Sequence, residues 1–354
     1  MSFHLPTAPK ARIAVVRSLP GLGDLLCAVP ALQSLRAACP QAHITWIGLP
    51  RTEWFAQRFS ALLDDFLAFP GYPGIPEGWQ SERATVDFLA QTQAEPFDLV
   101  IQMHGNGSAM NAFVALVGAK VRAGFHLPGQ YCSQPESFLA YPEGVPEIMR
   151  SQQLMTFLGA PLQSNEMSFP VTPAEQQRYQ SLAALHDLRP GSYICVHPGA
   201  SDDSRRWSSA GFAQVADHIA AKGYRIVLTG TPAEQPLIQE VQQQMYTRCL
   251  NLVGRTDLGT LAALLQHCAL LICNDTGVSH LAAALKVPSV VIFSNSEINR
   301  WAPLNRQLHR VIDSRESGTA TTAAVLMQVN EQLRDLPQPQ RRPQPQPIEV
   351  SHVV

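Results

Sequence analysis

Short runs of β-branched residues alternate with helical patterns along most of this 354-residue chain. In the first half, the predicted strands are 12–17, 43–48 and 98–102, and the predicted helices are about 24–38, 109–117 and 147–158. Alternation of this kind is typical of βαβ units, in which helices connect the strands of a parallel sheet. The fold class is therefore predicted to be α/β.

A second alternating series follows residues 127–173, where prolines accumulate and the pattern weakens. Its predicted strands are 193–196, 224–228, 270–273 and 289–293, and its predicted helices are 209–221, 233–245, 258–267 and 278–286. The chain length also fits two domains, since a domain usually contains about 100–200 residues. We expect an N-terminal domain at 1–170, a C-terminal domain at 171–335 and a disordered Pro- and Gln-rich tail at 336–354.

Charged residues make up only 15% of the chain, and the formal net charge is −2. Proteins that bind nucleic acid through bulk charge carry a basic excess, so the composition argues against such a partner. No apolar run reaches the roughly 18 residues that a membrane-spanning helix needs, and we expect no secretory signal. The seven cysteines never occur as CxxC, which favours reduced thiols in the cytoplasm over a zinc site or a disulfide framework.

The loop after the first predicted strand, LPGLGDL at 19–25, contains two glycines that let the backbone approach a ligand closely. In open parallel sheets, ligands bind at the carboxyl ends of the strands, where this loop lies. A dinucleotide fingerprint would need a small residue where Leu26 stands and an acidic residue near Gly48, at the end of the second strand. An NAD site is therefore not expected.

Asp24 in this loop has two interpretations. As an N-cap, its carboxylate would accept hydrogen bonds from free backbone N–H groups, which typically adds about 1 kcal/mol of stability. As a general base, it would face the ligand site and accept a proton from an attacking hydroxyl. Its position alone favours the N-cap.

The segment VHPGASDDSRRW at 196–207 leaves a predicted strand through a turn of small residues. Guanidinium groups such as those of Arg205 and Arg206 match the geometry of phosphate oxygens. The alternative is a surface loop in which these arginines pair with Asp202 and Asp203.

The segment NDTGVSH at 274–280 follows another predicted strand and opens a helix, where free N–H groups can bind an anion. His280 within it is either a phosphate donor or a buried core histidine. Glu234 either accepts ribose hydroxyls or balances a helix dipole in a first turn. Together these segments predict a nucleotide-diphosphate pocket in the second domain.

With these residues in view, the chain resembles glycosyltransferase family 9, the ADP-heptose:lipopolysaccharide heptosyltransferases, over about residues 11–310. The resemblance rests on GLGDLLCAVPALQSLR, DLVIQMHGN, VHPGASDDSRRW, VLTGTPAE, NLVGRTDLGTLAALL and NDTGVSHLAAAL. It implies the GT-B architecture, in which two Rossmann-like domains have parallel sheets that face each other across a cleft. The first domain would bind the acceptor and the second the nucleotide sugar.

The resemblance also assigns roles to individual residues. Asp24 matches the family's catalytic base. The residues that would bind the donor are Gly199, Ser201, Arg205, Arg206, Glu234, Gly254, Thr256, Asp275, Thr276, Gly277, Val278 and His280. Those on the acceptor side would be Gly23, His104 and Asn106. No metal is implied, and no DxD motif occurs in the sequence.

Two positions depart from the family pattern. Ser208 stands where a proline commonly follows the tryptophan, and Ser108 stands where members often carry a basic residue for charged inner-core sugars. The second departure leaves the identity of the acceptor open.

The resulting expectation is an inverting, metal-independent glycosyltransferase that needs no cofactor. It would move a heptose or related sugar from an ADP-sugar to a hydroxyl of a lipopolysaccharide core or related glycan, with a lipid-linked or soluble acceptor. We expect a cytoplasmic monomer, either free or in peripheral contact with the cytoplasmic face of the inner membrane. The alternatives are a GT-B-like nucleotide-sugar epimerase and a non-catalytic protein that binds sugar nucleotides.

Overall fold

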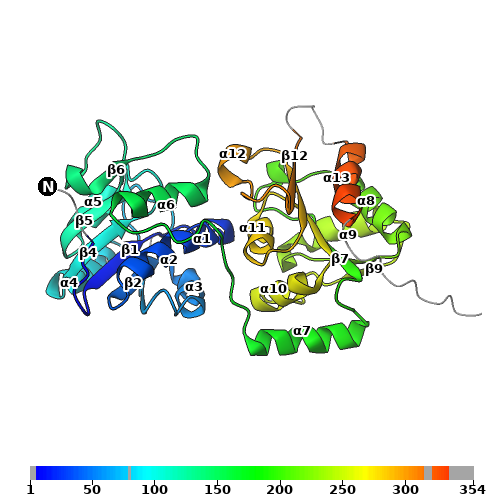
Figure 1. Ribbon diagram of the computed structural model, residues 1–354, viewed down its shortest axis with the longest axis horizontal. Helices are drawn as coiled ribbons and strands as arrows, with labels where there is room; N and C mark the ends of the chain where they lie inside the picture. Colours follow the sequence, from blue (N-terminus) through cyan, green and yellow to red (C-terminus); the bar gives the residue numbers. More distant parts are fainter. Residues whose placement is uncertain (1–4, 79–80, 315–320, 335–354) are drawn as a thin grey trace, which may run out of the picture. The chain divides into compact units, whose positions relative to one another are not determined.

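The computed structural model describes residues 5–78, 81–314 and 321–334, and the chain divides into two compact units (Figure 1). The first unit consists of Met1–Pro170, Thr276–Leu285 and Ser296–Leu304. The second consists of Val171–Asp275, Lys286–Asn295 and Asn305–Val354. The expected tail at 336–354 lies outside the described residues.

The first unit is built on a parallel six-stranded sheet with the strand order β3-β2-β1-β4-β5-β6. Its strands are β1 (Arg12–Val16), β2 (His43–Gly48), β3 (Asp65–Ala68), β4 (Phe97–Gln102), β5 (Ala119–His126) and β6 (Phe138–Ala140). Its helices are α1 (Leu22–Leu26), α2 (Val29–Ala38), α3 (Glu53–Arg58), α4 (Glu82–Ala94), α5 (Met110–Leu116), α6 (Glu147–Phe157), α11 (Gly277–Ala284) and α12 (Ile298–Trp301).

The second unit repeats this plan with the strand order β12-β11-β10-β7-β8-β9, again all parallel. Its strands are β7 (Tyr193–His197), β8 (Arg225–Leu228), β9 (Cys249–Asn251), β10 (Leu270–Asn274), β11 (Ser289–Phe293) and β12 (His309–Asp313). Its helices are α7 (Pro173–His186), α8 (Ser209–Ala221), α9 (Gln235–Gln244), α10 (Leu258–His267) and α13 (Thr322–Arg334).

The central strands of both sheets are buried on both faces. β7, β10 and β11 are buried along their whole length, as a parallel sheet covered by helices requires. In each sheet the strand order reverses between the first and fourth strands of the unit, β1 and β4 or β7 and β10. Ligands in doubly wound folds bind beside this reversal, at the carboxyl ends of the strands. The loops after these four strands are therefore the expected location of a ligand-binding site.

One predicted helix, at 24–38, is wrong as a single element. The structure has α1 and α2 instead, with Cys27 and Ala28 between them. Pro30 is the cause, because it has no N–H to donate to the carbonyl of Leu26 and its ring would clash with that carbonyl in a continuous helix. Pro30 is accepted at the second position of α2, where no intrahelical donor is needed.

The described residues contain no helix that is long and apolar enough to cross a membrane. All seven cysteines are free thiols, of which Cys27, Cys39, Cys195, Cys268 and Cys273 are buried. The core of the first unit gathers around Phe113, which packs against Phe69, Tyr72 and Phe88.

Candidate active site

Asp24 lies in the short helix α1, directly beyond the carboxyl end of β1. The N-cap of α1 is Gly21, so the N-cap interpretation of Asp24 is wrong. A methyl group at Gly21 would clash with the Asp24 carboxylate, so the glycine leaves the space that this carboxylate occupies. The Asp24 side chain is 24% exposed. It is therefore enclosed but still accessible to a ligand.

Burial raises the pKa of Asp24 above its ordinary value. The guanidinium groups of Arg17 and Arg300 and the His280 ring act in the opposite direction, while the carboxylate of Glu147 raises this pKa further. A carboxylate with a raised pKa is a stronger base, which suits it to accept a proton from a hydroxyl.

Arg17, the residue after β1, hydrogen-bonds to the backbone of the Asp24 segment and fixes its position. Its side chain is 1% exposed and donates hydrogen bonds to the carbonyls of Asp24 (3.0 Å) and Met103 (2.6 Å) and to the Glu147 carboxylate (3.1 Å). Its Nη2 also lies 3.9 Å from Asp24 Oδ1. Through these hydrogen bonds Arg17 connects the Asp24 loop to the residue after β4 and to the first residue of α6.

Glu147 compensates the buried charge of Arg17. It is 4% exposed and also pairs with Arg150 and with Arg300, whose Nε lies 3.1 Å from its Oε2. Burial alone would raise the pKa of Glu147, but the three guanidinium groups outweigh that effect and hold it below its ordinary value. Sequence reasoning missed Arg17, Glu147 and Arg300, because no local pattern links residues so far apart in the chain.

Within the first unit, α1 packs tightly against α11, and glycines make this contact possible. A Cβ atom at Gly23 would lie 2.6 Å from Cδ2 of His280, and one at Gly277 would lie 2.8 Å from Cβ of Leu22. The His280 ring is buried, its Nδ1 lies 3.8 Å from Cys27 Sγ, and Trp301 packs edge-on against it. Two of the predicted site residues, Gly23 and His280, are thus brought together beside Asp24.

The predicted acceptor-side residues His104 and Asn106 lie in the loop after β4. His104 Nδ1 is 3.0 Å from the hydroxyl of Ser18, and burial together with the cation of Arg17 lowers the His104 pKa to about 4. His104 is therefore neutral near pH 7. Asn106 Oδ1 accepts a hydrogen bond from the backbone of Ser108, 3.0 Å away, and shapes this loop.

In the second unit, Gly199 and Glu234 form the same kind of pair as Gly21 and Asp24. A side chain at Gly199, after β7, would clash with the Glu234 carboxylate, after β8. Oε2 of Glu234 accepts hydrogen bonds from the backbone N–H (2.7 Å) and the hydroxyl (2.9 Å) of Thr231 in a capping box. This carboxylate is therefore fixed at the carboxyl edge of the sheet.

The two predicted phosphate-binding arginines differ in their surroundings. Arg206 donates to the carbonyl of Ala200 (3.0 Å) and pairs with Asp203 (2.6 Å), so it braces its own loop. Arg205 is partly exposed, and no hydrogen bond or ion pair joins its side chain to another described residue. Arg205 is thus the arginine available to a ligand.

Asn274 and Asp275, at the end of β10, connect to the same loop. Asn274 is fully buried, accepts from the backbone of Trp207 (2.9 Å) and donates to the carbonyl of Pro198 (2.6 Å). It was not among the predicted site residues, although it opens the NDTGVSH segment. Asp275 is also buried, with its N–H bonded to Ile292.

The remaining predicted donor residues are divided between loops of the second unit and the start of α11, which belongs to the first unit. Gly254 has a φ of 67° and donates its N–H to the carbonyl of Gly230, which places it beside the loop that leads to Glu234. Thr276 is the N-cap of α11, with Gly277 and Val278 as the first helical residues. Ser201 is exposed and Thr256 half-buried, and neither side chain makes a hydrogen bond with a described residue.

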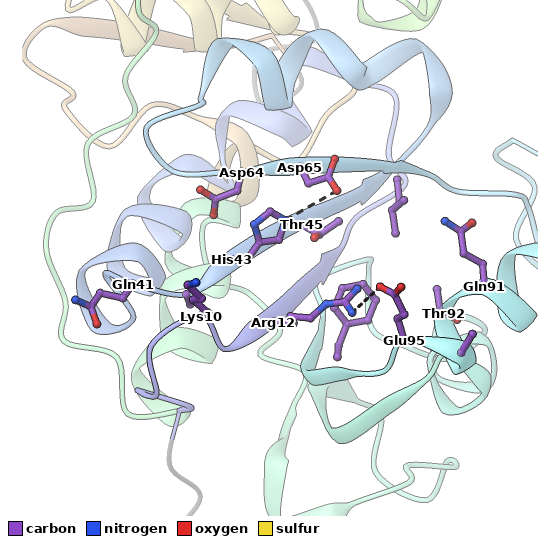
Figure 2. Close-up of a pocket in the computed structure, with 14 residues that line it drawn as sticks. Lys10, Arg12, Gln41, His43, Thr45, Asp64, Asp65, Gln91, Thr92 and Glu95 are labelled. Carbon is purple, nitrogen blue, oxygen red and sulfur yellow. Dashed lines mark hydrogen bonds and ion pairs between the residues drawn. The ribbon is translucent and has the colours of Figure 1, made fainter.

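A hollow of about 820 Å³ lies at the amino end of the first sheet, away from these residues (Figure 2). Two pairs of its side chains contact each other, since Arg12 Nη1 is 3.0 Å from Glu95 Oε2 and His43 Nε2 is 3.9 Å from Asp65 Oδ2. Because doubly wound sheets bind ligands at the opposite edge, we assign no site here. Among the described residues, no group of three or more His, Cys, Asp or Glu side chains could hold a metal ion.

Comparison with solved structures identifies the class of fold. The structure of the ADP-heptose lipopolysaccharide heptosyltransferase II of Escherichia coli matches with a TM-score of 0.73 at 20% identity, covering 91% of this chain and 98% of that one. The E. coli heptosyltransferase WaaC with ADP matches with a TM-score of 0.67 at 22% identity, covering 91% and 99%. The protein thus has the GT-B fold.

The sequence comparisons then give the family. The profile of glycosyltransferase family 9 (heptosyltransferase) matches residues 87–325, which is more than half of the chain. Lipopolysaccharide heptosyltransferase 3 of Escherichia coli is 24% identical over 81% of this chain and 84% of its own length. Lipooligosaccharide heptosyltransferase 2 of Haemophilus influenzae is 28% identical, but this match spans only 41% of that relative. The chain belongs to glycosyltransferase family 9 and is a glycosyltransferase of the heptosyltransferase family.

Proposed function

We propose that this protein transfers a heptose or related sugar, with inversion and without a metal ion, from an ADP-sugar to a hydroxyl of a lipopolysaccharide core or related glycan. The observation that carries the proposal is the carboxylate of Asp24, held at the carboxyl end of β1 with a pKa raised by burial. The free, largely buried cysteines are consistent with a reducing cytoplasm as the place of reaction.

In this reaction Asp24 accepts the proton of the acceptor hydroxyl while that oxygen forms a bond to the anomeric carbon. The bond from this carbon to the ADP oxygen breaks on the opposite face, and its electron pair leaves with ADP. An aspartate of ordinary pKa, near 3.9, is a weak base, so the raised pKa of Asp24 assists the proton transfer.

The negative charge that grows on the departing ADP needs fixed positive partners. Arg205 has a guanidinium with no described protein partner, and the N–H groups of Gly277 and Val278 at the start of α11 are unused by the helix. Groups that are already oriented toward the developing charge stabilise it without reorganisation. Glu234 is suited to accept hydrogen bonds from ribose hydroxyls, since its carboxylate is fixed by Thr231.

The test is Asp24→Ala, assayed with ADP-heptose and a lipopolysaccharide-core acceptor. We expect transfer to be abolished while ADP affinity stays within about twofold of the wild type. If the variant keeps more than about a tenth of the wild-type turnover, the loss is only ~1.4 kcal/mol of barrier and the base assignment is wrong. Incubation with donor alone separates the epimerase alternative, because an epimerase would release an altered sugar without any acceptor.

A further inference from the structure

A small pocket of about 200 Å³ lies at the carboxyl edge of the first sheet. One wall is the loop Gly74–Glu77, and the other is the loop after β4, from His104 to Met110. Within 104–110, Gly107 has a φ of 84°, and a side chain there would clash with the carbonyl of Phe125. The backbone conformation of this loop therefore shapes the pocket, and that conformation requires glycine at position 107.

Glu77 contributes a carboxylate side chain to the lining of this pocket. Its Oε2 is buried, and no residue that the structure describes donates a hydrogen bond to it. Glu77 as a whole is only half-buried and lines the pocket, so a ligand bound there can donate hydrogen bonds to its side chain. Sugar hydroxyls are donors of this kind, whereas a phosphate group would bring a second negative charge.

His104 lines the same pocket and carries no charge near pH 7. Burial and the neighbouring cation of Arg17 lower its pKa to about 4, and Ser18 engages its Nδ1. Arg17 itself is buried, with its charge compensated by Glu147. Of the described residues that line the pocket, none is a lysine or arginine. The pocket thus offers hydrogen bonds without a cation.

An apolar surface adjoins the pocket. The residues Gly74, Ile75 and Pro76 also line a second hollow of about 520 Å³, whose other lining residues are Tyr72, Pro73 and Glu82. Carbon faces of a sugar ring pack well on such a surface, and an amphipathic ring such as tyrosine is suited to that contact.

We infer that this pocket is an acceptor subsite, and that it selects a sugar residue without phosphate or carboxylate groups. Glu77 would accept from its hydroxyls, and His104 and Asn106 would complete the polar wall. The inference rests on the proposed function, because it takes the pocket as part of the acceptor site. Ser18 supports this assignment, since it links His104 to the loop that carries Asp24.

The experiment is a binding measurement in the absence of turnover. The probes are methyl heptoside and the same heptoside carrying one phosphate, each titrated into the full chain with saturating ADP and followed by ligand-observed NMR. For the wild type we expect the uncharged heptoside to bind at least tenfold more tightly than its phosphate ester. For Glu77→Gln we expect this preference to fall to threefold or less, because the like charge is removed.

Glu136→Gln is the matched control, since Glu136 is exposed and lines neither the small pocket nor the adjoining hollow. It should retain the wild-type preference. Equal or tighter binding of the phosphate ester to the wild type, no binding of either probe, or an unchanged preference in Glu77→Gln would each overturn the inference. Because no transfer is measured, failure of the proposed function would appear separately, as a lack of sugar transfer from ADP-heptose.

Discussion

Arg17 and Glu147 are 130 residues apart in the sequence, yet their side chains form a buried ion pair with 3.1 Å between Nη2 and Oε1. The same Nη2 lies 3.9 Å from Asp24 Oδ1. Glu147 therefore determines how much of the positive charge of Arg17 acts on Asp24. Since Arg300 also pairs with Glu147, the basicity of Asp24 depends on charges from α6, from α12 and from the residue after β1.

Two substitutions in this set should move the pH dependence of kcat/KM in opposite directions. A general base must be unprotonated, so activity is lost as the pH falls through the pKa of Asp24. Glu147 raises that pKa, so Glu147→Gln should shift the acidic limb to lower pH. Arg300 lowers it, so Arg300→Gln should shift the limb to higher pH.

The two variants also differ in their expected stability. Glu147→Gln leaves Arg17 buried without its counter-charge, which should cost on the order of 3–5 kcal/mol of unfolding free energy. Arg300 is 30% exposed, so Arg300→Gln should lower the unfolding free energy much less. Its pH profile of kcat/KM can therefore be measured even if Glu147→Gln folds poorly. Acidic limbs that move in the same direction, or not at all, would contradict the electrostatic account.

Gly21→Ala should impair catalysis without destabilising the fold. Gly21 has φ −72° and ψ 136°, which alanine adopts without strain, so the backbone tolerates the change. The new methyl group would displace the Asp24 carboxylate, which can rotate away at little cost to the fold. We expect kcat to fall at least tenfold, with ADP affinity and the midpoint of urea unfolding near the wild-type values. Wild-type kcat in a folded variant would show that the position of this carboxylate does not matter.

His309 should make the stability of the protein depend on pH. It is buried at the start of β12 with Nδ1 2.8 Å from the Ser289 hydroxyl, and burial lowers its pKa to about 4. Because the unfolded chain binds this proton near pH 6.5, the unfolding free energy should fall as the pH drops from 6.5 to about 4.

His309→Asn removes the titrating group and should remove this part of the pH dependence. The difference in unfolding free energy between variant and wild type should change by on the order of 2–3 kcal/mol across this window. Urea unfolding at pH 7 and at pH 4.5 measures it. A constant difference at both pH values would mean that His309 titrates normally in the folded protein.

The sequence pattern predicted most of the inner strands, because these are buried on both faces and appear as apolar runs. The strands β2 and β11 have the predicted bounds, and β1 and β10 differ by one residue. The edge strands β3, β6, β9 and β12 were all missed, and so was β5, which lies between β4 and β6. These are short or carry polar residues, as in Asp65–Ala68 and His309–Asp313, so they lack the apolar signal of a central strand.

The site residues follow a similar division. Asp24 and Glu234 could be proposed from the sequence, because each stands in a loop of small residues at the end of a predicted strand. Arg17, Glu147 and Asn274 could not, because their roles depend on partners 67 to 130 residues away that only the folded chain brings near. The separate roles of Arg205 and Arg206 could not be predicted either, because both side chains can bind phosphate and only their tertiary contacts differ.

That last distinction can be tested by comparing Arg205→Gln with Arg206→Gln. The Arg205 guanidinium has no partner among the described residues, so its removal should cost a charge-assisted hydrogen bond to the diphosphate, about 1.5–3 kcal/mol. This corresponds to a roughly 10- to 150-fold rise in the Kd for ADP, which calorimetry can measure. Arg206 is engaged with Ala200 and Asp203, so Arg206→Gln should change the Kd less than about threefold while loosening its loop. If both substitutions weaken ADP binding equally, Arg206 must exchange its protein partners for the ligand, and the bracing role assigned to it here is wrong.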